Sequence, residues 1–94
     1  MRAIERSSAF KRDFKRIKKT PNHRNDIDAL LTAILSLLAE DKALPDNNRD
    51  HSLSGDWVSY RECHIKPDLL LIYQKPNEIT LRLARLGSHS ELFG

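Results

Sequence analysis

The sequence predicts an α+β fold of two layers, in which a helical hairpin packs on an antiparallel sheet in the order β-α-α-β-β-β. Two observations carry this prediction. The first half of the chain has two segments with apolar residues at helical spacing, and the second half has three short apolar segments joined by turn residues. The chain has 94 residues and no low-complexity linker, so a single domain over residues 1–94 is expected.

The first half should hold one short strand and two helices. Residues 2–6 alternate weakly in polarity and predict a first strand. Residues 9–19 carry apolar side chains at i, i+4 and i+7, and Ser7 is a good N-cap for a helix there. Residues 27–38 repeat the pattern over three turns, with Asn25 as the expected N-cap. The two helices should form an antiparallel hairpin on one face of the sheet.

The second half should form a three-stranded meander after a polar loop at residues 42–55. Residues 57–65 are rich in aromatic and β-branched side chains, residues 69–74 are apolar on both faces, and residues 78–86 alternate. A segment apolar on both faces predicts a central, covered strand. Proline and asparagine at residues 75–77 predict the turn between the last two strands.

Charge is unevenly distributed along the chain. The net charge is +3, but residues 1–24 hold nine basic and two acidic side chains, whereas residues 25–94 hold seven basic and eleven acidic ones. A positive field at one end is typical of proteins that bind a polyanion or an acidic partner, although a solvated helix face has the same composition. The basic side chains of the first helix are Lys11, Arg12, Lys15, Lys18 and Lys19.

Membrane and secreted classes are not expected. The longest apolar run, residues 69–73, is far shorter than the roughly 20 residues that span a bilayer, and the first ten residues have no apolar signal core. The single cysteine, Cys63, cannot form an internal disulfide, so a cytoplasmic protein is expected. Cys63 is expected in the core.

Three of the four histidines occur within the second half of the chain and are the strongest candidates for chemistry. His51 precedes the meander, His64 ends its first strand and His89 follows its last strand, while Asp68 lies in the first turn. Strand ends and turns of a meander can converge, so these four side chains can share one surface. An imidazole is able to be neutral or protonated near neutral pH, which suits acid–base cleavage of RNA through its own 2′-hydroxyl. His23, in the inter-helix turn, is expected to be exposed.

Other chemistries have weaker signals. No pair of ligands at metal-binding spacing occurs, although three histidines and an aspartate can still form a zinc site by tertiary convergence. No nucleophile elbow or phosphate-binding loop is present. Cys63 and His64 are neighbours on a predicted strand, so they point to opposite faces and cannot form a nucleophile–base pair.

Two stretches of sequence identify a family. Asp50–Tyr73 reads D-H-x-L-x-G-x-W-x-x-Y-R-x-x-H-x-x-P-D-x-x-L-I-Y, and Arg85–Gly94 reads R-x-G-S-H-x-x-L-F-G. In these motifs and in the order of elements before them, the chain resembles the YafQ branch of the RelE/ParE superfamily of bacterial toxins. It departs from the branch at Ser88, where threonine is common, and in the length of the turn at residues 75–78.

The resemblance implies a RelE-like toxin of a type II toxin–antitoxin system: an mRNA interferase that enters the ribosomal A site and cuts mRNA without a metal or other cofactor. The family's functional histidines fall on His51, His64 and His89, its acidic residue on Asp68 and its terminal aromatic residue on Phe93. The implied partners are mRNA, ribosomal RNA and a DinJ-like antitoxin with an acidic C-terminal arm. The antitoxin would be the DNA-binding half, so the toxin alone is not expected to bind DNA.

Within this hypothesis, His89 is assigned as general acid and Asp68 as general base, with His51 and His64 assisting. Either Arg61 or Arg85 can hold the scissile phosphate, or both can form structural ion pairs. Phe93 can stack on a base or pack on the core, and the basic first helix can bind ribosomal RNA.

Two other function classes stay open at this stage. A ParE-like toxin of the same fold would inhibit DNA gyrase without cleaving RNA, and it would not need the histidines. A non-catalytic module would only bind an acidic partner through residues 1–24.

Overall fold

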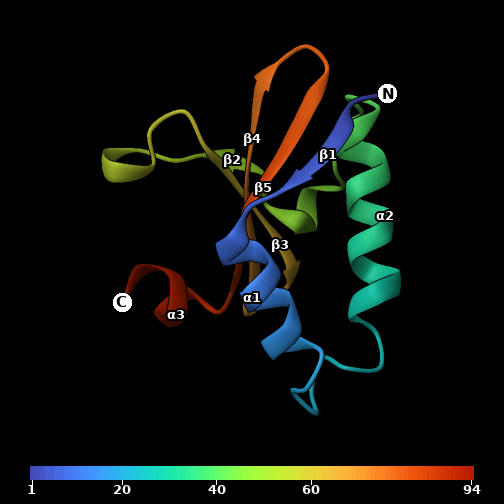
Figure 1. Ribbon diagram of the computed structural model, residues 1–94, viewed down its shortest axis with the longest axis vertical. Coiled ribbons are helices and arrows are strands. Elements are labelled where there is room, and N and C mark those ends of the chain that lie inside the picture. Colours follow the sequence, from blue (N-terminus) through green and yellow to red (C-terminus); the bar gives the residue numbers. More distant parts are fainter.

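The computed structural model describes residues 1–94 and has the predicted α+β architecture (Figure 1). The five strands lie in the order β1-β5-β4-β3-β2. The helices and strands are β1 (Ala3–Arg6), α1 (Ser8–Ile17), α2 (Ile27–Ala39), β2 (His51–Ser52), β3 (Arg61–Lys66), β4 (Leu69–Asn77), β5 (Thr80–Gly87) and α3 (His89–Phe93), with short 3-10 turns η1 (Asp46–Asn48) and η2 (Gly55–Trp57).

The sheet is mixed rather than wholly antiparallel. β3, β4 and β5 form the predicted antiparallel meander, and β2 pairs antiparallel with β3. β1, however, pairs parallel with β5, with Ala3 opposite Thr80 and Arg6 opposite Leu83. Only a tight hairpin forces two strands to be antiparallel. Because α1, α2 and the strands β2 to β4 separate β1 from β5 in the chain, that constraint does not apply to this pair.

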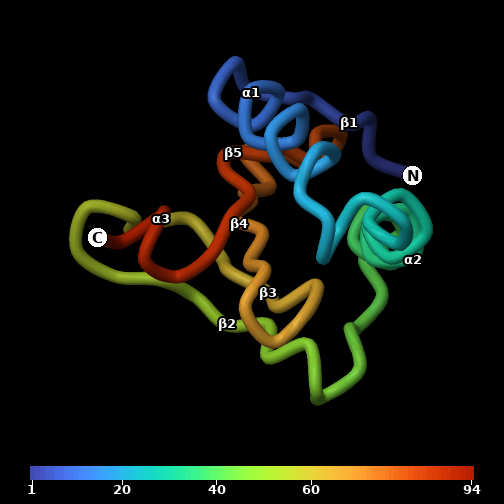
Figure 2. The backbone as a smooth tube through the Cα atoms, turned by 90° about the horizontal axis from the view of Figure 1, so that it is seen from below, coloured from blue at the N-terminus to red at the C-terminus, as the bar shows by residue number.

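Both faces of β4 are covered, as its two-sided apolar sequence predicted. Seen along the sheet, α1 and α2 lie on one side, and α3 lies on the other with the loop that carries η2 (Figure 2). Leu71 and Tyr73 pack with the apolar faces of α1 and α2 in the main core. Leu70 and Ile72 point the other way and form a smaller cluster with Leu92 of α3. The second cluster lies on the face of the sheet that also carries Glu62 and His64, the register partners of Ile72 and Leu70.

The first helix begins at the predicted cap. The Ser7 hydroxyl accepts a hydrogen bond from the Phe10 backbone N–H (2.9 Å) and donates one to the Ala84 carbonyl (2.8 Å). The same side chain therefore starts α1 and fastens it to β5 at the point where β1 ends.

Three boundaries differ from the prediction. Asp26, not Asn25, precedes α2, and it makes no side-chain cap. The strand predicted over residues 57–65 begins only at Arg61, because η2 forms a turn and Ser59 adopts a positive φ of 80°. β4 runs through the predicted turn to Asn77, so the reversal falls on residues 78–79.

An irregularity in the β4–β5 pairing allows β4 to continue past Pro76. Proline normally breaks a strand because it has no N–H for the ladder. Pro76 lies where the β4–β5 register shifts between Gln74 and Asn77, and at that irregularity the missing donor is tolerated.

No helix is both long and apolar enough to cross a membrane.

Candidate active site

A buried carboxylate lies between two of the predicted histidines. His51 of β2 is the register partner of Glu62 on β3, and His64 follows Glu62 by two residues. Directly paired residues, and residues two apart on a strand, point to the same face. Glu62 is 4 % exposed, and its two oxygens lie 3.3 Å from His51 Nε2 and 3.8 Å from His64 Nε2. Glu62 therefore lies between the two imidazoles on one face of the sheet.

The ring of His51 lies between two acceptors. Its Nδ1 is 2.6 Å from the Arg49 carbonyl oxygen, and its Nε2 faces Glu62. A carbonyl only accepts, so Nδ1 carries the proton of the first contact. The two contacts orient this ring beside Glu62.

A side chain of the η1 turn binds the backbone of His64. The Asn48 side-chain amide donates to the His64 carbonyl at 2.7 Å. A polar cleft of about 430 Å³ opens beside it. The cleft is lined by Asn47, Asn48, Arg49, His64, Ile65, Lys66 and Pro67. A cleft of this size and polarity next to an imidazole can admit part of a nucleotide.

The third histidine lies on α3 beside the predicted aspartate. The His89 backbone N–H points at Asp68 Oδ1 of the β3–β4 turn at 3.4 Å, and the His89 ring lies against Phe93 with centroids 5.1 Å apart. Phe93 is 38 % exposed. It is thus not part of the core, which was one of the two possibilities for this side chain, and its ring remains open to solvent.

Local sequence explains why α3 forms at this point. The Ser88 hydroxyl accepts from the Glu91 N–H while the Glu91 carboxylate accepts from the Ser88 N–H, which is a capping box. Leu92 anchors the helix in the smaller core cluster. At Gly87 a Cβ would come within 3.0 Å of Glu91 and 3.3 Å of Leu92, so glycine lets α3 turn back onto the sheet. These contacts place His89 and Phe93 on the sheet face that carries Glu62.

The two groups of side chains occupy the same face without touching. Leu70 on β4 pairs with His64 on one side and with Gly87 on the other. Neighbouring strands are about 4.8 Å apart, so the backbones of His64 and Gly87 are roughly 10 Å apart. No hydrogen bond or ion pair joins His51, Glu62 and His64 to Asp68 and His89.

Of the two candidate arginines, the structure does not bring Arg61 to this face. Arg61 is adjacent to Glu62 on β3, so it points to the opposite side, and its register partner Tyr73 belongs to the main core. Its Nε pairs with Asp50 at 3.2 Å, and Asp50 also accepts from the Tyr73 hydroxyl at 2.6 Å. Arg61 thus has the structural ion pair that was one of its two expected roles.

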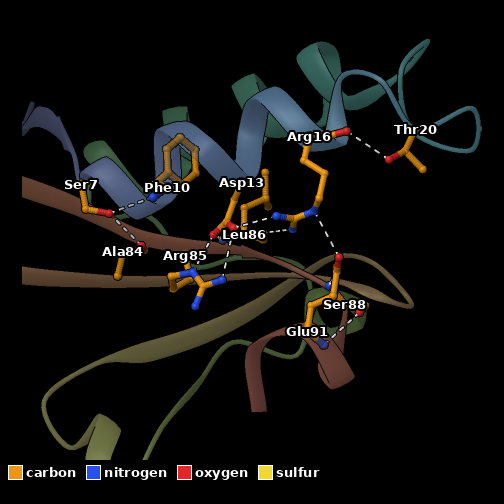
Figure 3. A network of polar contacts seen from close by, with 10 residues as sticks. All are labelled: Ser7, Phe10, Asp13, Arg16, Thr20, Ala84, Arg85, Leu86, Ser88 and Glu91. Carbon is orange, nitrogen blue, oxygen red and sulfur yellow. Dashed lines mark hydrogen bonds and ion pairs between the residues drawn. The ribbon is translucent and has the colours of Figure 1, made fainter. Parts of the chain in front are cut away.

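Arg85 also forms an ion pair, but at the edge of β5 (Figure 3). Its Nε and Nη2 donate to the two oxygens of Asp13 at 2.7 and 3.2 Å. Burial by itself would raise the pKa of Asp13, but hydrogen bonds from Arg85, the Leu86 N–H and Arg16 outweigh it and hold the pKa below its usual value. Arg85 lies in the same row across the sheet as Glu62, because Ile72 on β4 is the register partner of both residues.

The basic side chains of α1, together with Lys18 and Lys19 just after its last residue, divide into two kinds. Arg16 pairs with Asp13 and Glu91, and Lys18 pairs with Asp28 of α2. The other four have no ion pair and, like most of this helix surface, are exposed. They are Lys11, Arg12, Lys15 and Lys19. Because α1 covers the opposite face of the sheet, this positive surface is separate from the histidines.

Two further residues test the sequence predictions. Cys63 is fully buried in the main core, as predicted, and burial raises the pKa of its thiol to about 12, so it cannot act as a nucleophile. His23 is half-buried rather than exposed, and its Nδ1 has no hydrogen-bond partner.

The sequence analysis missed Glu62 and Asp13. Both are charged residues in the core, a position that single-sequence patterns rarely predict. For Glu62 a signal was available, since E-x-H on a strand places both side chains on one face. No cluster of three or more His, Cys, Asp or Glu side chains is arranged to hold a metal ion.

Comparison with known proteins identifies the family. The family model of the "Bacterial toxin of type II toxin-antitoxin system, YafQ" matches residues 2–94. The mRNA interferase toxin YafQ of Escherichia coli K12 is 36% identical over 93 residues, covering 99% of this chain and 97% of that protein.

Solved structures agree. The toxin of the E. coli DinJ-YafQ complex aligns with a TM-score of 0.84 at 36% identity, covering 100% of both chains. A metal-bound toxin from Helicobacter pylori aligns with a TM-score of 0.86 at 47% identity, covering 99% of this chain and 100% of that one. The chain therefore belongs to the YafQ family of toxins from bacterial type II toxin–antitoxin systems, a family whose curated E. coli members are mRNA interferases and hence endoribonucleases.

Proposed function

We propose that this toxin cleaves mRNA on the ribosome by attack of the RNA's own 2′-hydroxyl on the adjacent phosphate. A base takes the 2′-OH proton, the O2′–P bond forms, and the P–O5′ bond breaks as an acid gives a proton to O5′. The products are a 2′,3′-cyclic phosphate and a free 5′-hydroxyl. The observation that carries this proposal is the convergence of Glu62, two histidines and the His89 helix on one face of the sheet.

His89 is the general acid and Asp68 the general base. Asp68 is an exposed carboxylate on a turn, able to accept a proton from a bound nucleotide. His89 is exposed at the start of α3, within reach of a leaving oxygen on the same substrate. Phe93 supports this arrangement, since its exposed ring next to His89 can stack on the flanking base.

His51 and His64 hold the reacting phosphate and activate the 2′-hydroxyl. Both rings face a single buried carboxylate, His51 at 3.3 Å and His64 at 3.8 Å, which favours one arrangement of the two rings. Preorganised donors of this kind stabilise the charge that develops on phosphate oxygens more than mobile side chains do. Glu62 acts through them and does not itself reach the substrate.

The unpaired cations of α1 are the binding surface for ribosomal RNA. Each cation that neutralises a phosphate releases counterions, which adds affinity without sequence preference. The reaction therefore takes place in the cytoplasm, where the ribosomal A site supplies both the mRNA and the surrounding RNA. A DinJ-like antitoxin with an acidic C-terminal arm is the neutralising partner, and its arm would cover the α1 cations by charge complementarity.

Mapping of RNA ends tests the function itself. We expect that expression of the chain in a bacterium without its antitoxin stops growth and leaves cleaved mRNAs with new 5′ ends inside reading frames. Purified chain should cut a defined mRNA only when ribosomes are present. Uncut mRNA together with falling DNA gyrase activity would instead support a ParE-like inhibitor, and cleavage of free mRNA would remove the ribosome from the proposal.

The salt dependence of ribosome binding tests the role of α1. The double variant Lys11→Ala and Lys15→Ala should bind ribosomes more weakly at low salt. The plot of log K against log salt should also become less steep in this variant. Its slope should change by about 0.7 to 0.9 for each phosphate that is no longer neutralised. Lys42→Ala, which removes a cation paired with Glu40 away from α1, is the control. An unchanged slope in the double variant would show that these two lysines do not contact RNA.

A further inference from the structure

We propose that Asp13 is a positioning residue for RNA cleavage: it grips one edge of the Arg85 guanidinium and turns the other edge toward the scissile phosphate. The inference rests on the proposed function, because it takes Arg85 as the phosphate-binding cation. It adds a residue on α1, a helix on the opposite side of the sheet from the histidines.

The Asp13 carboxylate is almost completely enclosed and fully used. Asp13 is 3 % exposed. One oxygen accepts from Arg16 Nη1 (3.0 Å) and Arg85 Nη2 (3.2 Å), and the other from Arg85 Nε (2.7 Å) and the Leu86 backbone N–H (3.0 Å). A buried carboxylate with four donors has a single allowed position, so the groups that it binds are fixed as well.

The location of this contact on β5 explains why an α1 residue can reach it. β1 pairs with β5 only as far as Leu83, so the β5 edge beyond that residue has no strand beside it. The N–H of Leu86 would point into solvent there, and Asp13 accepts it instead. Figure 3 shows Asp13 reaching down from α1 to this edge, with Arg85 below it and Arg16 extending toward α3.

The contact with Asp13 leaves the second edge of the Arg85 guanidinium without a partner. A guanidinium has five donors in one plane, and Asp13 takes the Nε–Nη2 edge. Nη1 makes no hydrogen bond, and the Arg85 side chain is 29 % exposed. An arginine held in this way offers its second edge to a phosphate at no further cost in side-chain entropy.

The same carboxylate also connects to the helix that carries His89. Arg16, which donates to Asp13, pairs through Nε with Glu91 of α3 at 3.1 Å. Its Nη2 additionally donates to the Leu86 carbonyl at 3.3 Å. Asp13 thus holds both the phosphate-binding arginine and the corner where β5 turns into α3.

A double-mutant cycle tests the proposal. Asp13→Asn, Arg85→Ala and the double variant are compared in single-turnover cleavage of mRNA on ribosomes, with the maximal rate and the half-saturating ribosome concentration determined separately. We expect Asp13→Asn to reduce the maximal rate by about 10²-fold with little change in half-saturation. The double variant should lose far less than the product of the two single losses, because most of the effect of Asp13 acts through Arg85.

The control carboxylate is Asp41, which also binds two cations, Arg2 and Lys75, but at the surface. Hydrogen bonds from Lys75 and Arg2 lower its pKa to about 2, so it is ionised at neutral pH, as Asp13 is. Asp41→Asn should cleave at the native rate. A native rate for Asp13→Asn, or a double variant slower by the product of both single losses, would overturn the proposal.

Arg85→Lys keeps the test decisive if Asp13→Asn does not fold. Lysine can still pair with Asp13 but has no second edge, so a loss of at least about tenfold in rate with an unchanged melting temperature is expected. A native rate for Arg85→Lys would overturn the two-edge arrangement. A native rate for Arg85→Ala would instead refute the proposed phosphate role of Arg85, and with it the premise of this inference.

Discussion

His89→Ala should lose about 10²- to 10⁴-fold in single-turnover cleavage of ribosome-bound mRNA, the range that a general acid or base contributes. Asp68→Ala should lose a similar factor. Neither side chain is in the core, so the melting temperature and antitoxin binding should stay close to those of the native chain. The rate is measured with toxin in excess over mRNA-loaded ribosomes, so that chemistry and not product release is followed.

His23→Ala is the matched control, because His23 lies in the turn between α1 and α2, away from the site face. It should cleave at the native rate. Native cleavage by His89→Ala would remove His89 from the mechanism, and loss of cleavage in His23→Ala would mean that histidine substitutions act through the fold.

Glu62→Gln should have the second largest effect on cleavage, about 10²-fold. The amide has the shape of the carboxylate but only one accepting oxygen, so it cannot hold His51 and His64 in the same way. A misplacement of catalytic groups by about 1 Å is enough for a loss of this size. The rate is measured as for His89→Ala, together with the melting temperature.

Glu78→Gln makes the same chemical change in the exposed turn between β4 and β5, where the carboxylate has no ion pair. It should be silent. If Glu62→Gln cleaves at the native rate while remaining folded, the buried carboxylate has no part in positioning the two histidines.

Periodicity predicted the elements that bury an apolar stripe and missed those that do not. α1, α2 and the central strand β4 each show a strong pattern, and all three formed, although α1 ends two residues before and β4 three residues after its predicted end. β2 has only two residues and forms by pairing with β3, so no local sequence pattern predicts it. The direction of β1 was also beyond a local reading, because a strand that pairs with a distant strand takes its direction from the whole fold.

The candidate residues could be chosen from the sequence where a residue type alone indicates chemistry, and their catalytic roles stay predictions. His51, His64, His89 and Asp68 were all expected on one surface, and the structure puts them on one face in two groups. Which arginine lies on the face of the histidines was not predictable. Arg61 points to the opposite face because its neighbour Glu62 is on the histidine face, and Arg85 is held by an aspartate 72 residues away in the sequence.

The central claim is that side chains on this face cleave mRNA through its 2′-hydroxyl, and a substrate lacking that group tests it most directly. Ribosomes are loaded with an mRNA that carries a single 2′-deoxynucleotide immediately 5′ of the cleaved bond, beside an unmodified mRNA. The toxin is treated with EDTA and dialysed before it is added, so that the ribosomes keep their Mg²⁺. We predict cleavage of the unmodified mRNA to a 2′,3′-cyclic phosphate and no cleavage at the deoxy position. Cleavage of the deoxy substrate, or products ending in a 3′-hydroxyl and a 5′-phosphate, would contradict the account.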